Sequence, residues 1–158
     1  MKFTTEADEG PKLELAAEIL ASGGTIRLQA LGTSMLPSIW PSDVLSIEGK
    51  PRNIVPGDIV LVARDRRFFV HRLIEKDNSV WITRGDSLSQ NDEPVAEAQV
   101  LGRISLIHRK GKVVVPNSRL SLSRRSFAWL LCNWNSLRNI ALRFHSIRQC
   151  GGETATPL

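Results

Sequence analysis

Between residues 25 and 115 the sequence alternates short strand-like runs with turn residues, and this pattern limits the possible folds most strongly. In Thr25–Leu31, the residues Ile26, Leu28 and Ala30 alternate with polar neighbours, which is the period of a half-buried strand. Further runs bounded by turn residues lie at Asp43–Ile47, Ile59–Val62, Phe68–Ile74, Ser79–Thr83, Val100–His108 and Lys112–Val115. Many short strands with frequent turns predict a mainly β, antiparallel domain.

Two segments outside this region have helical spacing instead. Pro11–Ser22 carries apolar residues three and four apart and stops at Gly23-Gly24, so a short N-terminal helix is expected. From Leu122 onward, aromatic and aliphatic residues recur at helical spacing among arginines. We therefore divide the chain into an N-terminal helical segment (1–24), a β domain (25–116) and a basic amphipathic helical extension with a frayed tail (117–158).

Charge is distributed unevenly between these parts. Residues 1–102 hold 11 Lys and Arg against 15 Asp and Glu, whereas residues 103–150 hold 10 Lys and Arg and no acid. The basic helix has three interpretations: it packs back on the domain, it lies on an anionic membrane through residues such as Trp129 and Trp134, or it binds nucleic acid. We regard nucleic acid as the least favoured of the three partners.

The composition also bears on location and cofactors. No run of 18 apolar residues exists, and Met1–Pro11 lacks the apolar core of a secretory signal peptide. Cys132 and Cys150 do not form a disulfide framework, and no Cys/His cluster has metal-ligand spacing. We expect a cytoplasmic protein, with peripheral membrane contact as the alternative, and neither metal nor cofactor.

Three polar segments carry the residues of a candidate serine hydrolase: Gly32–Pro37, Val70–Leu73 and Arg84–Asp92. Ser34 follows a predicted strand and a glycine turn, His71 lies within a strand, and Asp86 and Asp92 share the next polar loop. A serine hydroxyl becomes a good nucleophile when a base removes its proton, and an aspartate can orient that base. By themselves these residues are weak indicators, since a single histidine on a strand is more often structural than catalytic.

Five motifs in order resemble the signal peptidase I and LexA-like serine peptidase superfamily (S24/S26 type), and within it the archaeal and endoplasmic-reticulum signal peptidases. The matching residues, which span roughly 25–107, are Ser34-Met35 with Pro37, Pro56–Val60, His71-Arg72, Gly85-Asp86 with Asp92, and Val100–Arg103. That branch has histidine as its base, whereas the bacterial and LexA-like branches have lysine. Two departures stand out. Such signal peptidases carry a membrane anchor, and we expect none from this sequence; and Gly32 stands two residues before Ser34, where the family often has a serine.

The resemblance implies a role for each matching residue. Ser34 corresponds to the nucleophile, His71 to the general base and Asp92 to the third catalytic residue, with Asp86 as the other aspartate of its motif. Whether Asp86 or Asp92 orients His71 stays open. The oxyanion hole is expected from the backbone of Ser34 with Thr33, and substrate contacts from Met35 and Pro37. The implied substrate is a peptide or preprotein bound as an added β-strand, with small residues before the cut.

We therefore expect a serine endopeptidase that removes a peptide, leader or signal segment. A histidine base predicts activity that rises between about pH 5.5 and 7.5. Two alternatives stay open: a catalytically idle peptide-binding module, and a self-processing LexA-like regulator. The second lacks an obvious cleavage site, because the one Cys-Gly bond, Cys150-Gly151, lies downstream of the nucleophile.

Overall fold

The computed structural model describes residues 10–77 and 80–118, and the strands within them follow the sequence pattern closely. The elements are α1 (Gly10–Ala21), β1 (Thr25–Gln29), β2 (Val44–Gly49), β3 (Ile59–Arg64), β4 (Arg67–Lys76), β5 (Val80–Arg84), β6 (Val95–Ala96), η1 (a 3₁₀ turn, Glu97–Gln99), β7 (Val100–Arg109) and β8 (Lys112–Val114). β6 and η1 were not expected, since two or three residues are too few to show a period. The predicted C-terminal helix lies outside the described residues.

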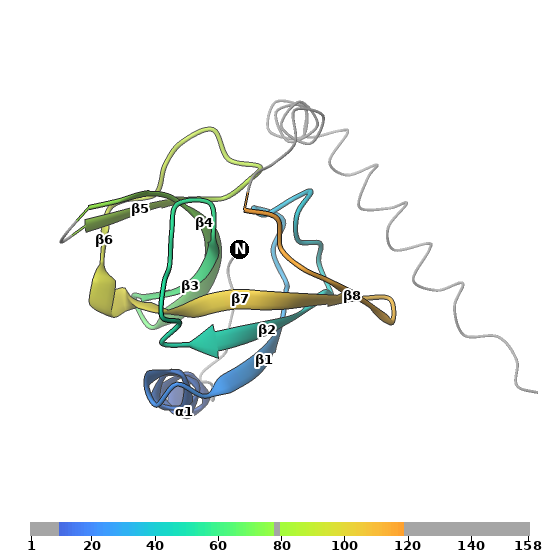
Figure 1. Cartoon of the computed structure of the whole chain (residues 1–158), viewed down its shortest axis with the longest axis horizontal. Coiled ribbons are helices and arrows are strands. Elements are labelled where there is room, and N and C mark those ends of the chain that lie inside the picture. Colours follow the sequence, from blue (N-terminus) through green and yellow to red (C-terminus); the bar gives the residue numbers. More distant parts are fainter. Residues whose placement is uncertain (1–9, 78–79, 119–158) are drawn as a thin grey trace, which may run out of the picture.

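All described strands belong to one antiparallel sheet, which confirms the predicted fold class. The order is β1-β2-β7-β3-β4-β5-β6, and β8 also pairs with β7. β7 is a long interior strand: it pairs with β2 on one edge and with β3 and β8 on the other. Register shifts within the β2–β7, β3–β7 and β4–β5 pairs bend the sheet, which curls strongly in Figure 1.

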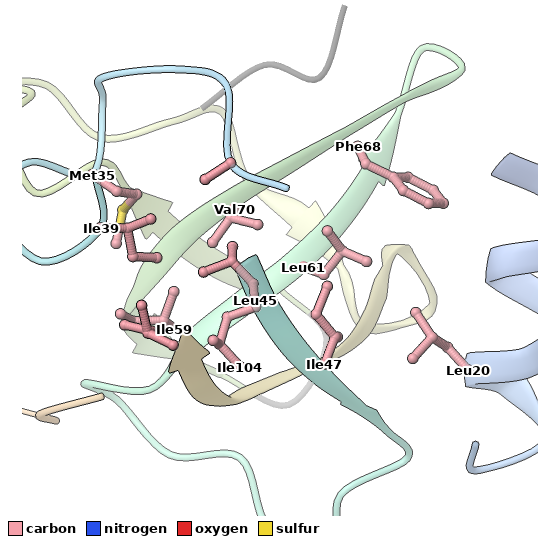
Figure 2. Close-up of a cluster of buried hydrophobic side chains, with 12 residues drawn as sticks. Leu20, Met35, Ile39, Leu45, Ile47, Ile59, Leu61, Phe68, Val70 and Ile104 are labelled. Atoms are coloured by element: carbon pink, nitrogen blue, oxygen red, sulfur yellow. The ribbon is translucent and has the colours of Figure 1, made fainter. Parts of the chain in front are cut away.

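Two hydrophobic clusters hold the curled sheet together, one on each of its faces. β3 shows the division, because Ile59 and Leu61 enter one cluster while Val60 and Val62 enter the other. This burial of both faces explains the uninterrupted apolar run in β3. The larger cluster joins β2, β3, β4 and β7 to α1 and to the segment after β1, as Figure 2 shows for Leu20, Met35 and Ile39. Burying each such side chain stabilises the fold by about 1.5–3 kcal/mol.

The helix α1 docks against the sheet rather than standing apart from it. It contacts β1, β2 and β7, and Leu20 is fully buried. Gly49 makes the approach possible, because a Cβ there would lie 2.1 Å from the Leu20 carbonyl oxygen. Its N–H also donates to the Gly24 carbonyl at 2.9 Å. Within residues 10–77 and 80–118, no helix has the length and apolar character that a bilayer crossing requires.

Candidate active site

Ser34 lies on a loop whose base and interior are both fixed. The loop leaves the edge strand β1 and is closed where the Ala30 N–H donates to the Asp43 carbonyl at 2.8 Å. A tight turn follows Ser34, with the Leu36 N–H donating to the Thr33 carbonyl at 3.1 Å. The side chains of Met35, Leu36 and Ile39 are buried, so they anchor the loop in the core. The serine therefore sits on a rigid turn beside the sheet.

His71 faces Ser34 from the middle of β4. The distance from Ser34 Oγ to His71 Nε2 is 3.0 Å, which is hydrogen-bond length. β4 pairs with β3 through His71 and Val60, and the histidine is only 6% exposed. The Phe69 ring packs edge-on against the imidazole, with ring centroids 5.3 Å apart. Strand pairing and ring packing together hold the imidazole in one orientation toward the serine.

Asp92 lies on the other side of the imidazole. His71 Nδ1 and Asp92 Oδ2 are 2.5 Å apart, so an Nδ1–H donates to the carboxylate and leaves Nε2 to accept the serine proton. Thr83 of β5 fixes the aspartate twice. Its hydroxyl donates to Asp92 Oδ2 at 2.7 Å, and its carbonyl accepts the Asp92 N–H at 2.8 Å. The structure thus brings Ser34, His71 and Asp92 into one hydrogen-bonded row.

Burial and hydrogen bonding together set the protonation states of His71 and Asp92. Desolvation lowers the pKa of His71 below its ordinary 6.5, and the Asp92 hydrogen bond opposes this only in part. Burial raises the pKa of Asp92, but the hydrogen bonds from His71 and Thr83 outweigh it and leave the pKa below the ordinary 3.8. At neutral pH the row therefore holds a neutral imidazole beside a carboxylate, which is the state a general base requires.

Asp86 takes no part in this row and belongs to a separate buried cluster. Its carboxylate accepts two hydrogen bonds from Arg72, Nε to Oδ1 at 2.7 Å and Nη2 to Oδ2 at 2.8 Å, and a third from the Ser38 hydroxyl. Arg72 Nη1 also donates to the carbonyls of Gly57 and Asn117 at 2.6 and 2.8 Å. Of the two candidate aspartates, the geometry therefore pairs Asp92 with His71 and Asp86 with Arg72.

The residues on either side of Asp86 press directly against the backbone of the nucleophile. The Ser87 N–H donates to the Ser34 carbonyl and the Ser87 hydroxyl to the Thr33 carbonyl, both at 2.9 Å. A Cβ on Gly85 would lie 2.6 Å from that Ser34 carbonyl oxygen, so only glycine allows this approach. The 85–87 segment consequently fixes the backbone that presents Ser34.

An open cleft of about 830 Å³ runs past this row. Ser34, His71 and Asp92 lie in its wall together with Gly32 and Thr33, the latter expected in the oxyanion hole. Exposed Leu31 and Leu88, at 54% and 41% exposure, stand on its rim. The catalytic groups are therefore accessible from solvent, and the cleft offers apolar surface to a peptide.

The expected substrate contacts of Met35 and Pro37 need correction. Met35 is 0% exposed and packs in the hydrophobic core, because its backbone turn directs the side chain inward behind Ser34. Pro37 follows a cis peptide bond and is half-buried, and its carbonyl accepts a hydrogen bond from the Trp40 indole. Neither residue lines the cleft. The Met35 side chain therefore packs in the core behind the turn that presents Ser34, and it does not face the cleft.

A family model described as Peptidase S24-like matches residues 2–105, about two thirds of the chain. The chain belongs to the Peptidase S24-like family. The matched range includes Ser34, His71 and Asp92 and the buried pair Arg72–Asp86. No curated protein and no solved structure gave a significant match to the chain.

Three positioning residues of this Peptidase S24-like domain went unnoticed in the sequence. Thr83 reads as an ordinary β-branched strand residue, while Ser38 and Ser87 read as turn residues, and their partners are 9 to 54 positions away in the chain. The one signal in the sequence is spacing: Thr83 lies two residues after Trp81, so both side chains leave the same face of β5, and the structure shows that face to be buried. Among the described residues, no group of three or more His, Cys, Asp or Glu side chains is arranged to hold a metal ion.

Proposed function

We propose that the protein is a serine endopeptidase that uses Ser34, His71 and Asp92. One observation carries this proposal: the continuous hydrogen-bonded row Ser34 Oγ–His71 Nε2 and His71 Nδ1–Asp92 Oδ2, at 3.0 and 2.5 Å, opens onto a cleft. Nucleophile, base and orienting group then stand in the order that acyl transfer requires. Membership of a peptidase family supports the same reaction class.

The reaction follows from this geometry. Ser34 Oγ attacks the scissile carbonyl carbon while its proton moves to His71 Nε2, and Asp92 stabilises the resulting imidazolium. The oxyanion forms beside the backbone of Ser34 and Thr33. His71 then protonates the departing amine, so the C–N bond breaks and an acyl-enzyme is left. A water molecule that gives its proton to His71 hydrolyses the acyl-enzyme and restores Ser34.

We further propose that the substrate is a peptide or leader segment with small residues before the cut, bound as an added β-strand. The histidine base and the motif order favour likeness to the archaeal and endoplasmic-reticulum signal peptidases over the lysine-dependent branches. A cytoplasmic site of action, with or without peripheral membrane contact, goes with this proposal. Its test is whether the cut substrates are cytosolic or exported proteins.

The first experiment compares the purified protein with its Ser34→Ala variant on a peptide library, with cut sites read by mass spectrometry. We expect cleavage after small residues that Ser34→Ala abolishes, because the nucleophile is lost. The matched control is Ser22→Ala, whose hydroxyl only caps the end of α1 through the Ile19 carbonyl. Equal cleavage by wild type and Ser34→Ala would refute the proposal.

Two other outcomes correspond to the alternative functions. Peptides that bind wild type and Ser34→Ala equally without being cut indicate an idle peptide-binding module. A purified chain whose intact mass shortens with time, and does so only when Ser34 is present, indicates a self-processing regulator.

A further inference from the structure

The β3–β4 hairpin forms one end of the cleft and presents arginine to it. The hairpin turns through Asp65 and Arg66, which both have positive φ (54° and 56°), and Arg64 pairs with Arg67 across the turn. Such a two-residue loop matches the twist of the flanking strands and fixes their register. Arg64, Asp65 and Arg67 all line the cleft that contains Ser34.

The two arginines that line this end of the cleft differ in how they are paired. Arg64 is already matched, since its guanidinium lies 3.3 Å from Glu93 and 3.9 Å from Asp65, and it covers the Phe69 ring. The Asp92 carboxylate is bound to His71. Arg67 is exposed, and within residues 10–77 and 80–118 its guanidinium has no hydrogen-bond or ion-pair partner. Within that part of the chain no carboxylate is bound to Arg67, so its positive charge can engage an anionic group of a ligand in the cleft.

Strand geometry fixes how far this charge lies from the reacting bond. Arg67, Phe69 and His71 are two residues apart along β4, so their side chains leave the same face of the strand. At about 3.3 Å per residue, Arg67 lies about 13 Å along β4 from His71. A peptide strand paired with β4 advances by the same distance per residue. The peptide residue opposite Arg67 therefore lies about four residues from the scissile bond.

β4 also has a free edge along this stretch. β3 pairs with residues 67–72 of β4, but β5 pairs on the other edge only from Arg72 to Lys76. In the described part of the chain, residues 67–71 consequently have no strand neighbour on that second edge. An extended peptide added here places its side chains opposite Arg67, within reach of a cross-strand ion pair.

We propose that Arg67 determines substrate specificity by selecting peptides with Asp or Glu about four residues from the scissile bond. This inference rests on the proposed peptidase function. It names a substrate class, acidic peptides, that a requirement for small residues at the cut does not specify. Arg67 contacts the substrate away from the reacting atoms, so it contributes to binding and not to the chemical step.

The test walks one aspartate through a peptide with a small residue at its cut, from four residues before the bond to four after. For wild type we expect kcat/KM to rise about 2- to 5-fold when the aspartate is about four residues from the bond on one side, the range typical of an exposed ion pair. Arg67→Glu should remove this preference and favour lysine at that position. Both the aspartate preference and its loss in Arg67→Glu should appear in KM, with kcat unchanged. The reason is that a contact far from the reacting bond stabilises the ground state and the transition state equally.

Arg52→Glu is the matched control, since Arg52 is exposed and lies in a different groove with Lys50 and Trp81. It alters the net charge equally and should leave the aspartate preference intact. If wild type cuts aspartate and alanine peptides equally at every position, or if the preference survives Arg67→Glu, the inference is wrong while the peptidase function stands. If wild type cuts none of the peptides, the proposed function itself fails.

Discussion

The imidazole of His71 connects burial directly to activity. Its pKa lies below 6.5 because burial disfavours the charged form, and the neutral form is the base that Ser34 needs. A nearby carboxylate without burial would have raised that pKa and moved the onset of activity to a higher pH. The packing around β4 therefore widens the pH range in which the serine can be activated.

From this shift we predict that kcat/KM rises with pH and reaches half of its plateau below pH 6.5. The sign follows from the active form: protonated His71 cannot accept the Ser34 proton, so activity falls as pH decreases through the lowered pKa. The rise thus begins at a lower pH than an unperturbed histidine would give. The measurement is the pH profile of kcat/KM on one cleaved peptide. A rise that starts above pH 8 would point to a different base.

At the residue level the sequence was most informative where side-chain chemistry is rare. Ser34 and His71 are identified by motif order, and the structure brings them together. The choice between Asp86 and Asp92 was open because both lie in one polar loop. It is decided by their hydrogen-bond partners, since Thr83 donates to Asp92 and Arg72 donates to Asp86. Met35 was misjudged, because adjacency to a nucleophile says nothing about which way a side chain points from a turn.

Among the elements, the loop from Gly85 to Ser87 has the closest contact with the nucleophile. It crosses the Ser34 carbonyl at a distance that leaves no room for a Cβ, and Asp86 holds it to β4 through Arg72. The Arg72–Asp86 pair is buried, with 7% and 3% of the side chains exposed. Breaking such a pair on one side costs about 3–5 kcal/mol, because a buried charge is left unmatched.

We predict that Gly85→Ala lowers kcat at least 10-fold, because the new Cβ, 2.6 Å from a backbone oxygen, must displace either the loop or Ser34. Gly10→Ala is the control, since a Cβ at Gly10 meets nothing within 4 Å. Peptide cleavage is measured alongside near-ultraviolet circular dichroism, which reports whether the variant is folded. A folded Gly85→Ala protein with wild-type kcat would contradict the assigned role of the contact.

The longer strands were predictable because each is an alternating or continuously apolar run of five to ten residues. Their pairing was not predictable in the same way. β7 joins β2 to β3 although its closest paired residues in these two strands, Gly49↔Gly102 and Val62↔Val100, are 53 and 38 positions apart in the sequence. Register shifts at Ser46/Ile47 and Leu61/Val62 depend on how the curled sheet fills its core, which no local pattern records.

For the whole molecule, the active site imposes a dependence of stability on pH. The pKa values of both His71 and Asp92 are lower in the folded chain than their ordinary values of 6.5 and 3.8. The unfolded chain therefore takes up protons first as the pH falls. The stability that these groups contribute is complete above their ordinary pKa values and is lost as pH falls through the folded ones.

We predict that the free energy of unfolding decreases from near pH 6.5 downward, before most carboxylates titrate. His71→Gln, which does not titrate, should remove the part of this decrease that begins near pH 6.5. Urea unfolding at a series of pH values, followed by fluorescence of the tryptophans, measures both proteins. A wild-type curve that stays flat down to pH 4.5, or an unchanged slope in His71→Gln, would show that the histidine is not buried in its neutral form.

The loop between β5 and β6 is fastened at two separate points. Ser87 is bonded to the backbone around Ser34, and Asp92 is bonded to Thr83, whereas residues 88–91 between them are exposed. Leu88 of this exposed stretch lines the cleft. For protein engineering, residues 88–91 are therefore a segment that can be replaced. We expect new sequences or lengths between Ser87 and Asp92 to alter which peptides bind, while the hydrogen bonds that position Ser34 and His71 are kept.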